Sequence, residues 1–142
     1  MNKDKIIVYT DGGSRGNPGI AGSGAYITHG DGRIIKEVSK ALGKQTNNFA
    51  EYEAVILGLE TIKKNLSTEK LKNIDVEVRM DSELVQRQLT GRYKVKDATL
   101  KLKFAEVCFL KSHFPNIKFT HIRRELNKEA DRLSNVAMDS QS

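Results

Sequence analysis

The stretch Ile6-Ile7-Val8-Tyr9-Thr10-Asp11-Gly12-Gly13 decides the fold. Its first five residues are all β-branched or aromatic, which favours a strand, and the Asp-Gly-Gly that follows is typical of a strand end. We expect a loop from Gly12 to Gly19, because glycine, serine, asparagine and proline fill that segment. Asp11 is therefore predicted to sit at the carboxyl end of the first strand.

Working outward from this strand, the next two segments predict a hairpin. Residues 22–28 and 33–39 have strand character, and His29-Gly30-Asp31-Gly32 joins them with an Asp-Gly turn signal. From Asn48 to about Leu66 the period changes to one buried helix stripe, with apolar residues at spacings of three and four: Tyr52, Val55, Ile56, Leu59, Ile62 and Leu66.

The second half of the chain alternates helices and strands. Residues 74–80 alternate apolar with charged side chains and predict a strand. Helices are expected at 82–89, 98–113 and 127–139, with a last strand at 117–122. The order βββ-α-β-α-α-β-α predicts an α/β domain with three layers. Its mixed sheet would be antiparallel on one side and parallel on the other, with helices on both faces.

Size and composition fit one small domain covering residues 1–142, with 38% hydrophobic and 30% charged residues. No apolar run approaches the roughly 20 residues that cross a bilayer. The start, Met1-Asn2-Lys3-Asp4-Lys5, lacks a signal-peptide pattern. We expect a cytoplasmic protein without a membrane partner, and nothing in the sequence demands more than a monomer. Cys108 is the only cysteine, which excludes an internal disulfide, and its apolar neighbours predict a buried, inert thiol.

The net charge of +6 is concentrated in one region. Between Gln86 and Lys111, seven basic residues face two acidic ones, a net +5. Such a cluster can hold a phosphate backbone, or it can be a solvated helix face with a loop; charge alone favours neither.

Four acidic residues stand at structurally informative positions. Asp11 and Asp81 each end a predicted strand, and the carboxyl ends of neighbouring parallel strands are where α/β sheets usually bind ligands. Glu51 and Asp131 are each expected in the first turn of a helix. Taken singly, each has an ordinary explanation: a turn former, a helix N-cap, a capping box with Asn48, or a carboxylate favoured by the helix dipole.

Taken together, the four acids predict a cation site. Clustered carboxylates repel one another, so a site that gathers them needs positive charge. Hard oxygen ligands in this number suit Mg²⁺ or Mn²⁺. Two such ions about 4 Å apart can clamp the attacking and leaving oxygens of a phosphodiester.

Four segments resemble type 1 ribonuclease H: residues 9–19, 46–51, 80–82 and 127–131, in the family's order and spacing over nearly the whole chain. The resemblance implies a five-stranded sheet of order 3-2-1-4-5. It also implies hydrolysis of the RNA strand of an RNA–DNA hybrid, leaving 5′-phosphate and 3′-hydroxyl ends. It assigns Asp11, Glu51, Asp81 and Asp131 as catalytic metal ligands for two ions with substrate bound, one activating a water and the other stabilising the departing 3′-oxygen.

The resemblance also implies which groups contact the hybrid. Gly12, Gly13, Asn17, Asn47 and Asn48 would line the minor groove, where 2′-hydroxyls distinguish RNA from DNA. The ordinary alternatives are a long hairpin connection for the glycines and helix capping for the asparagines.

Two features depart from the family pattern. Many members carry a histidine in a loop before the last helix, whereas residues 122–127 contain none. We expect His121 to lie within the strand in a structural role, and Glu125, Arg123 or Arg124 to be candidates for part of the missing role. The chain also has no tryptophan and no extra basic helix between Asp81 and Asp131; the 86–111 cluster, with Tyr93, is expected to be a weaker substitute.

Three other functions are compatible with parts of the sequence. A nucleotide-binding glycine loop is excluded, because no G-x-x-x-x-G-K-[ST] motif occurs and the glycine segment feeds a strand. Another nuclease of this fold fits the Asp-Gly-Gly and Thr-Asn-Asn contexts less well. A non-catalytic module that binds hybrid or structured RNA stays open, as do the preferred metal, activity on duplex RNA, and the choice between replication primers and R-loops as substrate.

Overall fold

The computed structural model describes residues 4–141; Met1 to Lys3, part of the segment inspected for a signal peptide, and Ser142 lie outside them. Within this range the chain forms, in order, β1 (Lys5–Arg15), β2 (Gly19–His29), β3 (Ile34–Gln45), α1 (Asn47–Asn65), α2 (Thr68–Lys72), β4 (Asp75–Met80), α3 (Glu83–Leu89), α4 (Ala98–Lys111), β5 (Ile117–His121), a 3-10 turn η1 (Arg124–Leu126) and α5 (Lys128–Asp139).

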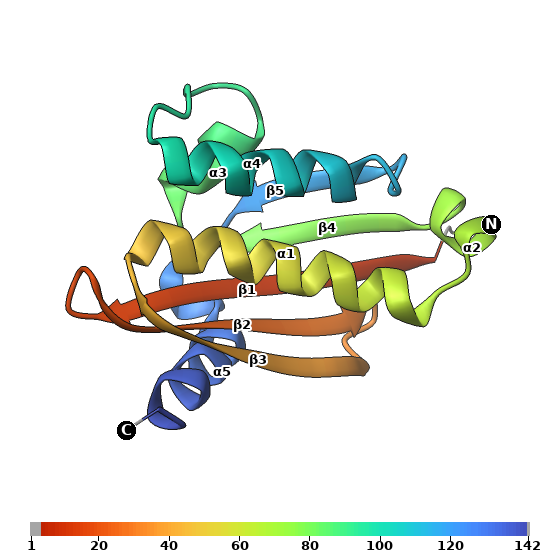
Figure 1. Ribbon diagram of the computed structural model, residues 1–142. Coiled ribbons are helices and arrows are strands. Elements are labelled where there is room, and N and C mark those ends of the chain that lie inside the picture. The colour runs from red at the N-terminus through yellow and green to blue at the C-terminus, as the bar shows by residue number, and fades with distance from the viewer. Residues whose placement is uncertain (1–3, 142) are drawn as a thin grey trace.

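The strands form one sheet of order β3-β2-β1-β4-β5, which confirms the expected order (Figure 1). β2 pairs antiparallel with β1 and with β3, while β4 pairs parallel with β1 and with β5. The hairpins hold the antiparallel half together, and the helical crossovers produce the parallel half. The carboxyl ends of β1, β4 and β5 therefore point to the same edge of the sheet.

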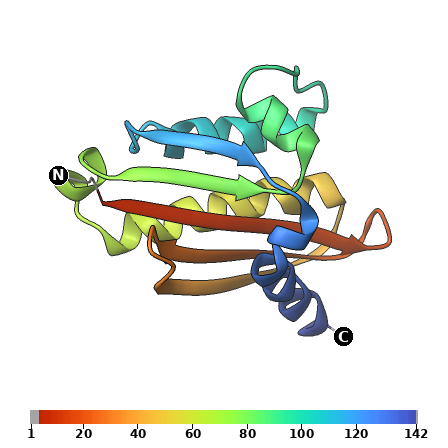
Figure 2. The ribbon, with the colours of Figure 1, turned by 180° about the vertical axis from the view of Figure 1, so that it is seen from behind.

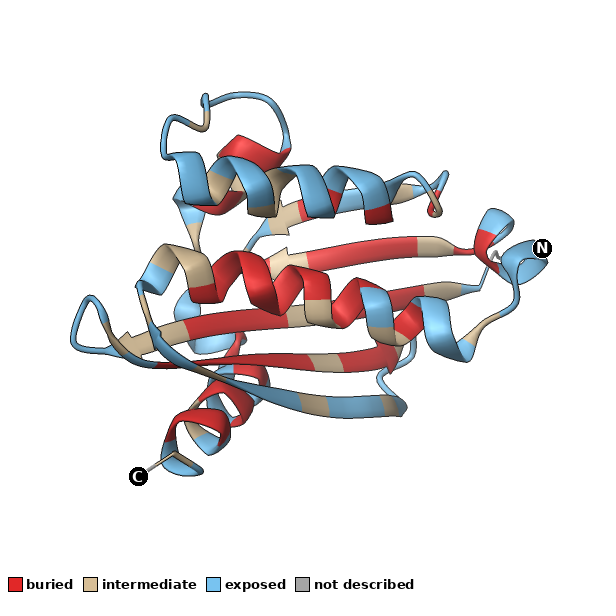
Figure 3. Ribbon diagram, viewed as in Figure 1, coloured by how far each residue is buried: buried red, intermediate tan, exposed pale blue. Residues whose placement is uncertain are grey.

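Helices cover both faces of the sheet, as expected. α1 crosses one face with α3 and α4 beside it, and α5 lies on the opposite face, over β1, β2 and β3 (Figures 1 and 2). The main core lies between α1 and the sheet, where the inner sides of both are buried (Figure 3). Five residues of the predicted α1 stripe are buried, and Leu66, at the helix end, is half-buried.

The predicted loop 12–19 was wrong. β1 continues to Arg15 and β2 begins at Gly19, with Gly12 opposite Ser23 and Arg15 opposite Ile20. The turn is confined to Gly16–Pro18, where Gly16 has a φ of +95°. Turn-forming residues were read as a loop, but the backbones of the two segments pair regardless of their small side chains.

The start of α1 also differs from the prediction. Thr46 is the N-cap, and its hydroxyl accepts a hydrogen bond from the Phe49 amide at 3.2 Å. The capping box between Asn48 and Glu51 was therefore wrong, and Glu51 lies two residues further into the helix than predicted, in its second turn. The short helix α2, which the sequence analysis missed, is capped by Ser67.

Cys108 is exposed, so the prediction of a buried thiol was wrong. The helix α4 buries only Val107 and Leu110 fully, and leaves Leu102 and Phe109 in solvent. Apolar content around Cys108 did not reveal that only one narrow stripe of α4 faces the core. Among the described helices, none is both long and apolar enough to cross a bilayer.

Candidate metal centre

Three of the four predicted ligands converge. Asp11, Glu51 and Asp81 each place one carboxylate oxygen within 4.8 Å of the other two. Asp11 and Glu51 are each only 8% exposed, and Asp81 is partly buried. The three side chains come from β1, α1 and the end of β4, so the cluster joins a helix to two adjacent strands.

Strand pairing brings Asp11 and Asp81 together. Thr10 lies opposite Met80 in the parallel β1–β4 pair, so the next residue of each strand reaches the same edge. The alternative role of Asp81 as an N-cap was wrong, because the Ser82 hydroxyl accepts the capping bond from the Val85 amide at 3.2 Å. Asp81 is therefore left to face the cluster.

Glu51 reaches the cluster because the α1 backbone lies directly on β1 and β2. A Cβ atom at Gly12 would stand 2.2 Å from the carbonyl carbon of Ala50, so no larger residue fits there without moving the helix. The buried Ser23 hydroxyl donates a 2.7 Å hydrogen bond to the Ala50 carbonyl. These two contacts fix the start of α1 against the sheet, and Glu51 follows immediately.

Asp131 lies beside the cluster but outside the group of three. It is exposed, and it contributes through hydrogen bonding and charge to the raised pKa of Asp11. Asn127 anchors the start of α5, because its buried amide donates a 2.9 Å hydrogen bond to the Thr10 carbonyl. The structure thus brings the fourth acid next to Asp11 on the open side of the site.

Two glycines of β2 allow α5 to approach. A Cβ atom at Gly24 would lie 2.6 Å from the Leu133 Cβ, and one at Gly22 would lie 2.7 Å from the Ala137 Cβ. The sequence pattern predicted a strand for residues 22–28 but no close helix contact. The Gly-x-Gly spacing within a strand pattern is the signal that could have predicted a close backbone approach.

The cluster is electrostatically prepared for a cation. Burial, followed by the charge of Asp81, raises the pKa of Asp11 to about 7. Burial and the charge of Asp11 raise the pKa of Glu51 well above its usual value. Glu51 Oε2 is buried and has no hydrogen-bond partner among the described residues. A hard divalent cation satisfies all three conditions, so these residues fit Mg²⁺ or Mn²⁺.

The residues expected to contact substrate gather at one end of the sheet. The Asn17 side-chain oxygen accepts from the Asn47 amide at 3.1 Å, and the Asn47 oxygen accepts from the Ser14 amide at 2.8 Å. These bonds tie the β1–β2 hairpin tip to the start of α1. Asn48 and Asn17 line a hollow of about 330 Å³ that extends to the start of α4. Gly12 is buried beneath α1, whereas Gly13 is partly exposed.

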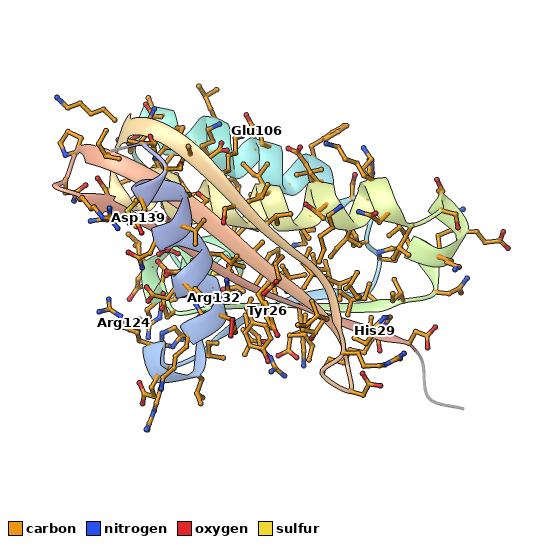
Figure 4. All side chains as sticks on the ribbon, turned by 90° about the horizontal axis from the view of Figure 1, so that it is seen from below. Tyr26, His29, Glu106, Arg124, Arg132 and Asp139 are labelled. Carbon is orange, nitrogen blue, oxygen red and sulfur yellow. The ribbon has the colours of Figure 1, made fainter. Side chains whose placement is uncertain are left out.

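The surroundings of the last strand agree with the expected place of His121. It is the final residue of β5, paired with Met80, and its side chain is exposed. Further along, Arg124 lies on the segment before α5, and Arg132 on α5 lies close to Tyr26 of β2 (Figure 4). Arg132 forms ion pairs with Glu129 and Glu37.

The basic cluster is not uniformly available to a ligand. Lys103 forms an ion pair with the buried Glu53, and Arg87 forms one with Glu83 while stacking over Tyr93. Arg92, Lys94, Lys96 and Lys101 are exposed, the first three on the loop between α3 and α4.

The sequence of this chain is similar to those of known ribonucleases H. A family profile described as "Reverse transcriptase-like" matches residues 9–137. The chain is 42% identical over 137 residues to the bifunctional protein Rv2228c of Mycobacterium tuberculosis, covering 96% of this chain and 36% of that protein. It is 39% identical over 135 residues to ribonuclease HI of Halobacterium salinarum, covering 95% and 65% respectively. The chain therefore spans about a third and just under two thirds of these relatives.

Solved structures agree with the sequence comparisons. LC11-RNase H1, solved in complex with an RNA/DNA hybrid, superposes with a TM-score of 0.90 at 51% identity, covering 96% of this chain and 98% of that one. RNase H1 from Halobacterium salinarum superposes with a TM-score of 0.87 at 39% identity, covering 96% and 98%. With its sheet order, its acidic cluster and these matches taken together, the chain belongs to the type 1 ribonuclease H family.

Proposed function

We propose that this protein is a divalent-metal-dependent endonuclease that hydrolyses the RNA strand of RNA–DNA hybrids, leaving 5′-phosphate and 3′-hydroxyl ends. The observation that carries the proposal is the convergence of Asp11, Glu51 and Asp81 within 4.8 Å, two of them buried. Support also comes from relatives named as ribonucleases H and from a relative solved with an RNA/DNA hybrid.

In this proposal the four acids hold two Mg²⁺ or Mn²⁺ ions when hybrid is bound. Asp11, Glu51 and Asp81 form the buried side of the site, and the exposed Asp131 faces the side from which substrate approaches. When bound, the ions supply positive charge for the carboxylates and activation of a water and of the scissile phosphate. The carboxylates are attached to the packed elements β1, β4 and α1, which keep them in place, so little reorganisation accompanies substrate binding.

The hairpin tip and the start of α1 are proposed to recognise the RNA strand. Gly13, Asn17, Asn47 and Asn48 would present backbone and amide groups to the minor groove, where the 2′-hydroxyls lie, while the buried Gly12 would contribute by letting α1 pack closely on β1. The hydrogen bonds between Asn17, Asn47 and Ser14 support this role, because they hold these groups as one preformed surface.

The test is a cleavage assay on end-labelled RNA–DNA hybrid, duplex RNA and duplex DNA of one sequence, each with Mg²⁺, Mn²⁺ or chelator. We expect internal cuts in the hybrid RNA with a divalent cation and none with chelator. Asp81→Asn should abolish cutting, whereas Asp75→Asn, at the opposite end of β4, should not. Binding of hybrid without cutting under any metal condition would identify a non-catalytic module instead.

A further inference from the structure

Ser134 of α5 places a hydroxyl between two of the proposed ligands. Its oxygen lies 3.4 Å from Asp11 Oδ2 and 2.9 Å from the Asp131 backbone carbonyl. Ser134 is only 1% exposed, so water does not compete for its hydrogen bonds. The hydroxyl carries one proton, so it can donate to only one of these two acceptors at a time, and the Asp11 carboxylate shares it with the helical turn that carries Asp131.

The position of Ser134 is set by the glycines of β2. A Cβ atom at Gly24 would stand 2.6 Å from the Ser134 amide nitrogen, and one at Gly22 would stand 2.8 Å from the Ser134 carbonyl oxygen. Ser134 is thus one of the residues whose backbone packs directly on the sheet. A rigid seat of this kind can hold a neighbouring side chain in one orientation.

A serine in a helix or at its end often donates to a carbonyl three or four residues earlier, and Ser140, the C-cap of α5, does this with Ala137 at 2.7 Å. The bond from Ser134 to Asp131 is of the same kind. Ser134 differs because a buried carboxylate also lies within reach of its hydroxyl. Asp11 is desolvated, and a desolvated carboxylate depends on nearby donors to keep its orientation.

We propose that Ser134 is a positioning residue, whose hydroxyl holds Asp11 Oδ2 so that the carboxylate keeps the orientation that receives a divalent cation. This inference rests on the proposed function only in assigning Asp11 as a ligand. Ser134 does not touch the substrate. Donors of this kind behind metal ligands typically change metal affinity or activity by about 10–100-fold when removed.

The test compares Ser134→Ala with Ser140→Ala, which removes a hydroxyl at the C-cap of the same helix that makes the same kind of backbone bond but does not bond to Asp11. Mg²⁺ titrations of the substrate-free protein, followed by amide NMR shifts, report cation affinity without any cleavage. We expect Ser134→Ala to weaken Mg²⁺ binding about 10-fold. It should lower kcat at limiting Mg²⁺, with recovery at high Mg²⁺, and leave KM for hybrid unchanged. Ser140→Ala should match the unmodified protein in every measurement.

Wild-type Mg²⁺ affinity in a folded Ser134→Ala protein would overturn the inference. If Ser134→Ala does not fold, Ser134→Cys keeps the size of the side chain with a weaker donor; its Mg²⁺ affinity must fall below wild type, and an unchanged value would overturn the inference. The two proposals fail separately. Weakened Mg²⁺ binding in Ser134→Ala, from a protein that never cuts hybrid, would uphold the positioning role and refute the nuclease.

Discussion

At the scale of single residues, the helix-capping roles that could have explained Asp81 and Glu51 are filled by neighbouring residues. Ser82 caps α3 in place of Asp81, and Thr46 caps α1 in place of Asn48. The carboxylates of Asp81 and Glu51 are therefore not used by their own helices. They turn toward Asp11, where burial and mutual repulsion make the folded state without metal electrostatically strained.

Asp11→Asn should stabilise the metal-free protein. A carboxyl whose pKa is raised from 3.8 to about 7 on folding costs nothing below pH 4; its cost grows between about pH 4 and pH 7 and is constant above that. The gain from the substitution should thus be absent near pH 4 and reach on the order of 4 kcal/mol by pH 8, since a rise from 3.8 to about 7 is roughly three pKa units at about 1.4 kcal/mol each. Thermal unfolding of both proteins in chelator, across this pH range, measures it. A gain that shrinks with rising pH would contradict the assigned electrostatics.

His121→Ala should leave most of the nuclease activity intact. His121 ends β5 with an exposed side chain, and the carboxylate cluster is complete without it. We expect less than about a tenfold loss in kcat/KM, which corresponds to less than about 1.4 kcal/mol, whereas Asp81→Asn should remove activity altogether. Equal losses in the two variants would show that His121 belongs to the catalytic group.

At the scale of elements, two helices reach the sheet through glycines and carry Glu51 and Asp131 with them. Gly12 admits α1, while Gly22 and Gly24 admit α5. The position of a ligand is therefore set by a backbone-to-backbone distance that belongs to neither element alone. The loop between α3 and α4 makes none of these glycine contacts. It holds the exposed cations Arg92, Lys94 and Lys96.

Gly24→Ala should both destabilise the fold and weaken the cation site. The added methyl group would stand 2.6 Å from the Leu133 Cβ and from the Ser134 amide nitrogen, so α5 must shift away from β2. We expect a loss of roughly 1–3 kcal/mol in unfolding free energy, together with weaker Mg²⁺ binding. Gly30→Ala is the control, because its nearest neighbour is the Lys5 side chain at 3.2 Å. An unchanged Mg²⁺ affinity in Gly24→Ala would show that the packing of α5 on β2 does not affect the cation site.

Neutralising the α3–α4 loop should weaken hybrid binding without changing the chemistry. Replacing Arg92, Lys94 and Lys96 with alanine removes three exposed cations. We expect KM for hybrid to rise and its dependence on salt to flatten, because fewer counterions are released on binding, while kcat stays the same. The charge-matched control replaces Lys64, Lys70 and Lys72 with glutamine on α1 and α2. If the two triple variants change KM for hybrid equally, the α3–α4 loop is not a specific binding site for the hybrid.

At the scale of the whole molecule, acids in different parts of the sheet respond to pH in opposite directions. In the carboxylate cluster the pKa values of Asp11 and Glu51 are raised, whereas Glu77 in the middle of β4 pairs with Lys5 at 3.0 Å and Arg79 at 3.1 Å. Burial opposes ionisation of Glu77, but hydrogen bonds from Arg79 and Lys5 outweigh it and lower its pKa to about 2. The carboxylate cluster thus destabilises the metal-free folded state, whereas the ion pairs of Glu77 stabilise it.

Glu77→Gln should destabilise the protein at neutral pH by about 2 kcal/mol, the usual value of hydrogen bonds to a charged group. Because the folded pKa is lowered, this stabilisation is complete above pH 4.5 and is lost as the pH falls through about 2. Denaturant unfolding of the two proteins at several pH values measures the difference. A difference that grows toward acid pH would contradict the assignment.

Much of this architecture could be predicted from local patterns. The β-branched run 6–10, the alternation in 74–80 and the α1 stripe fixed the types of the elements, and their order fixed the sheet order through the resemblance. The four acids were identified because their positions relative to these elements were distinctive. The failures arose where composition was read without pairing partners: residues 12–15 form strand, and Cys108 faces solvent.

By itself, the sequence determined which segments are strands and helices, and which acids stand at their ends, because periodicity and turn residues act over a few neighbours. Only the tertiary structure decided that Asp11, Glu51 and Asp81 meet while Asp131 stays at the open side, and that Ser134 and Asn127 hold their supporting backbone. The reason is physical. Such contacts join residues up to 123 positions apart, and they depend on how closely two backbones approach at glycines, a distance that no local pattern encodes.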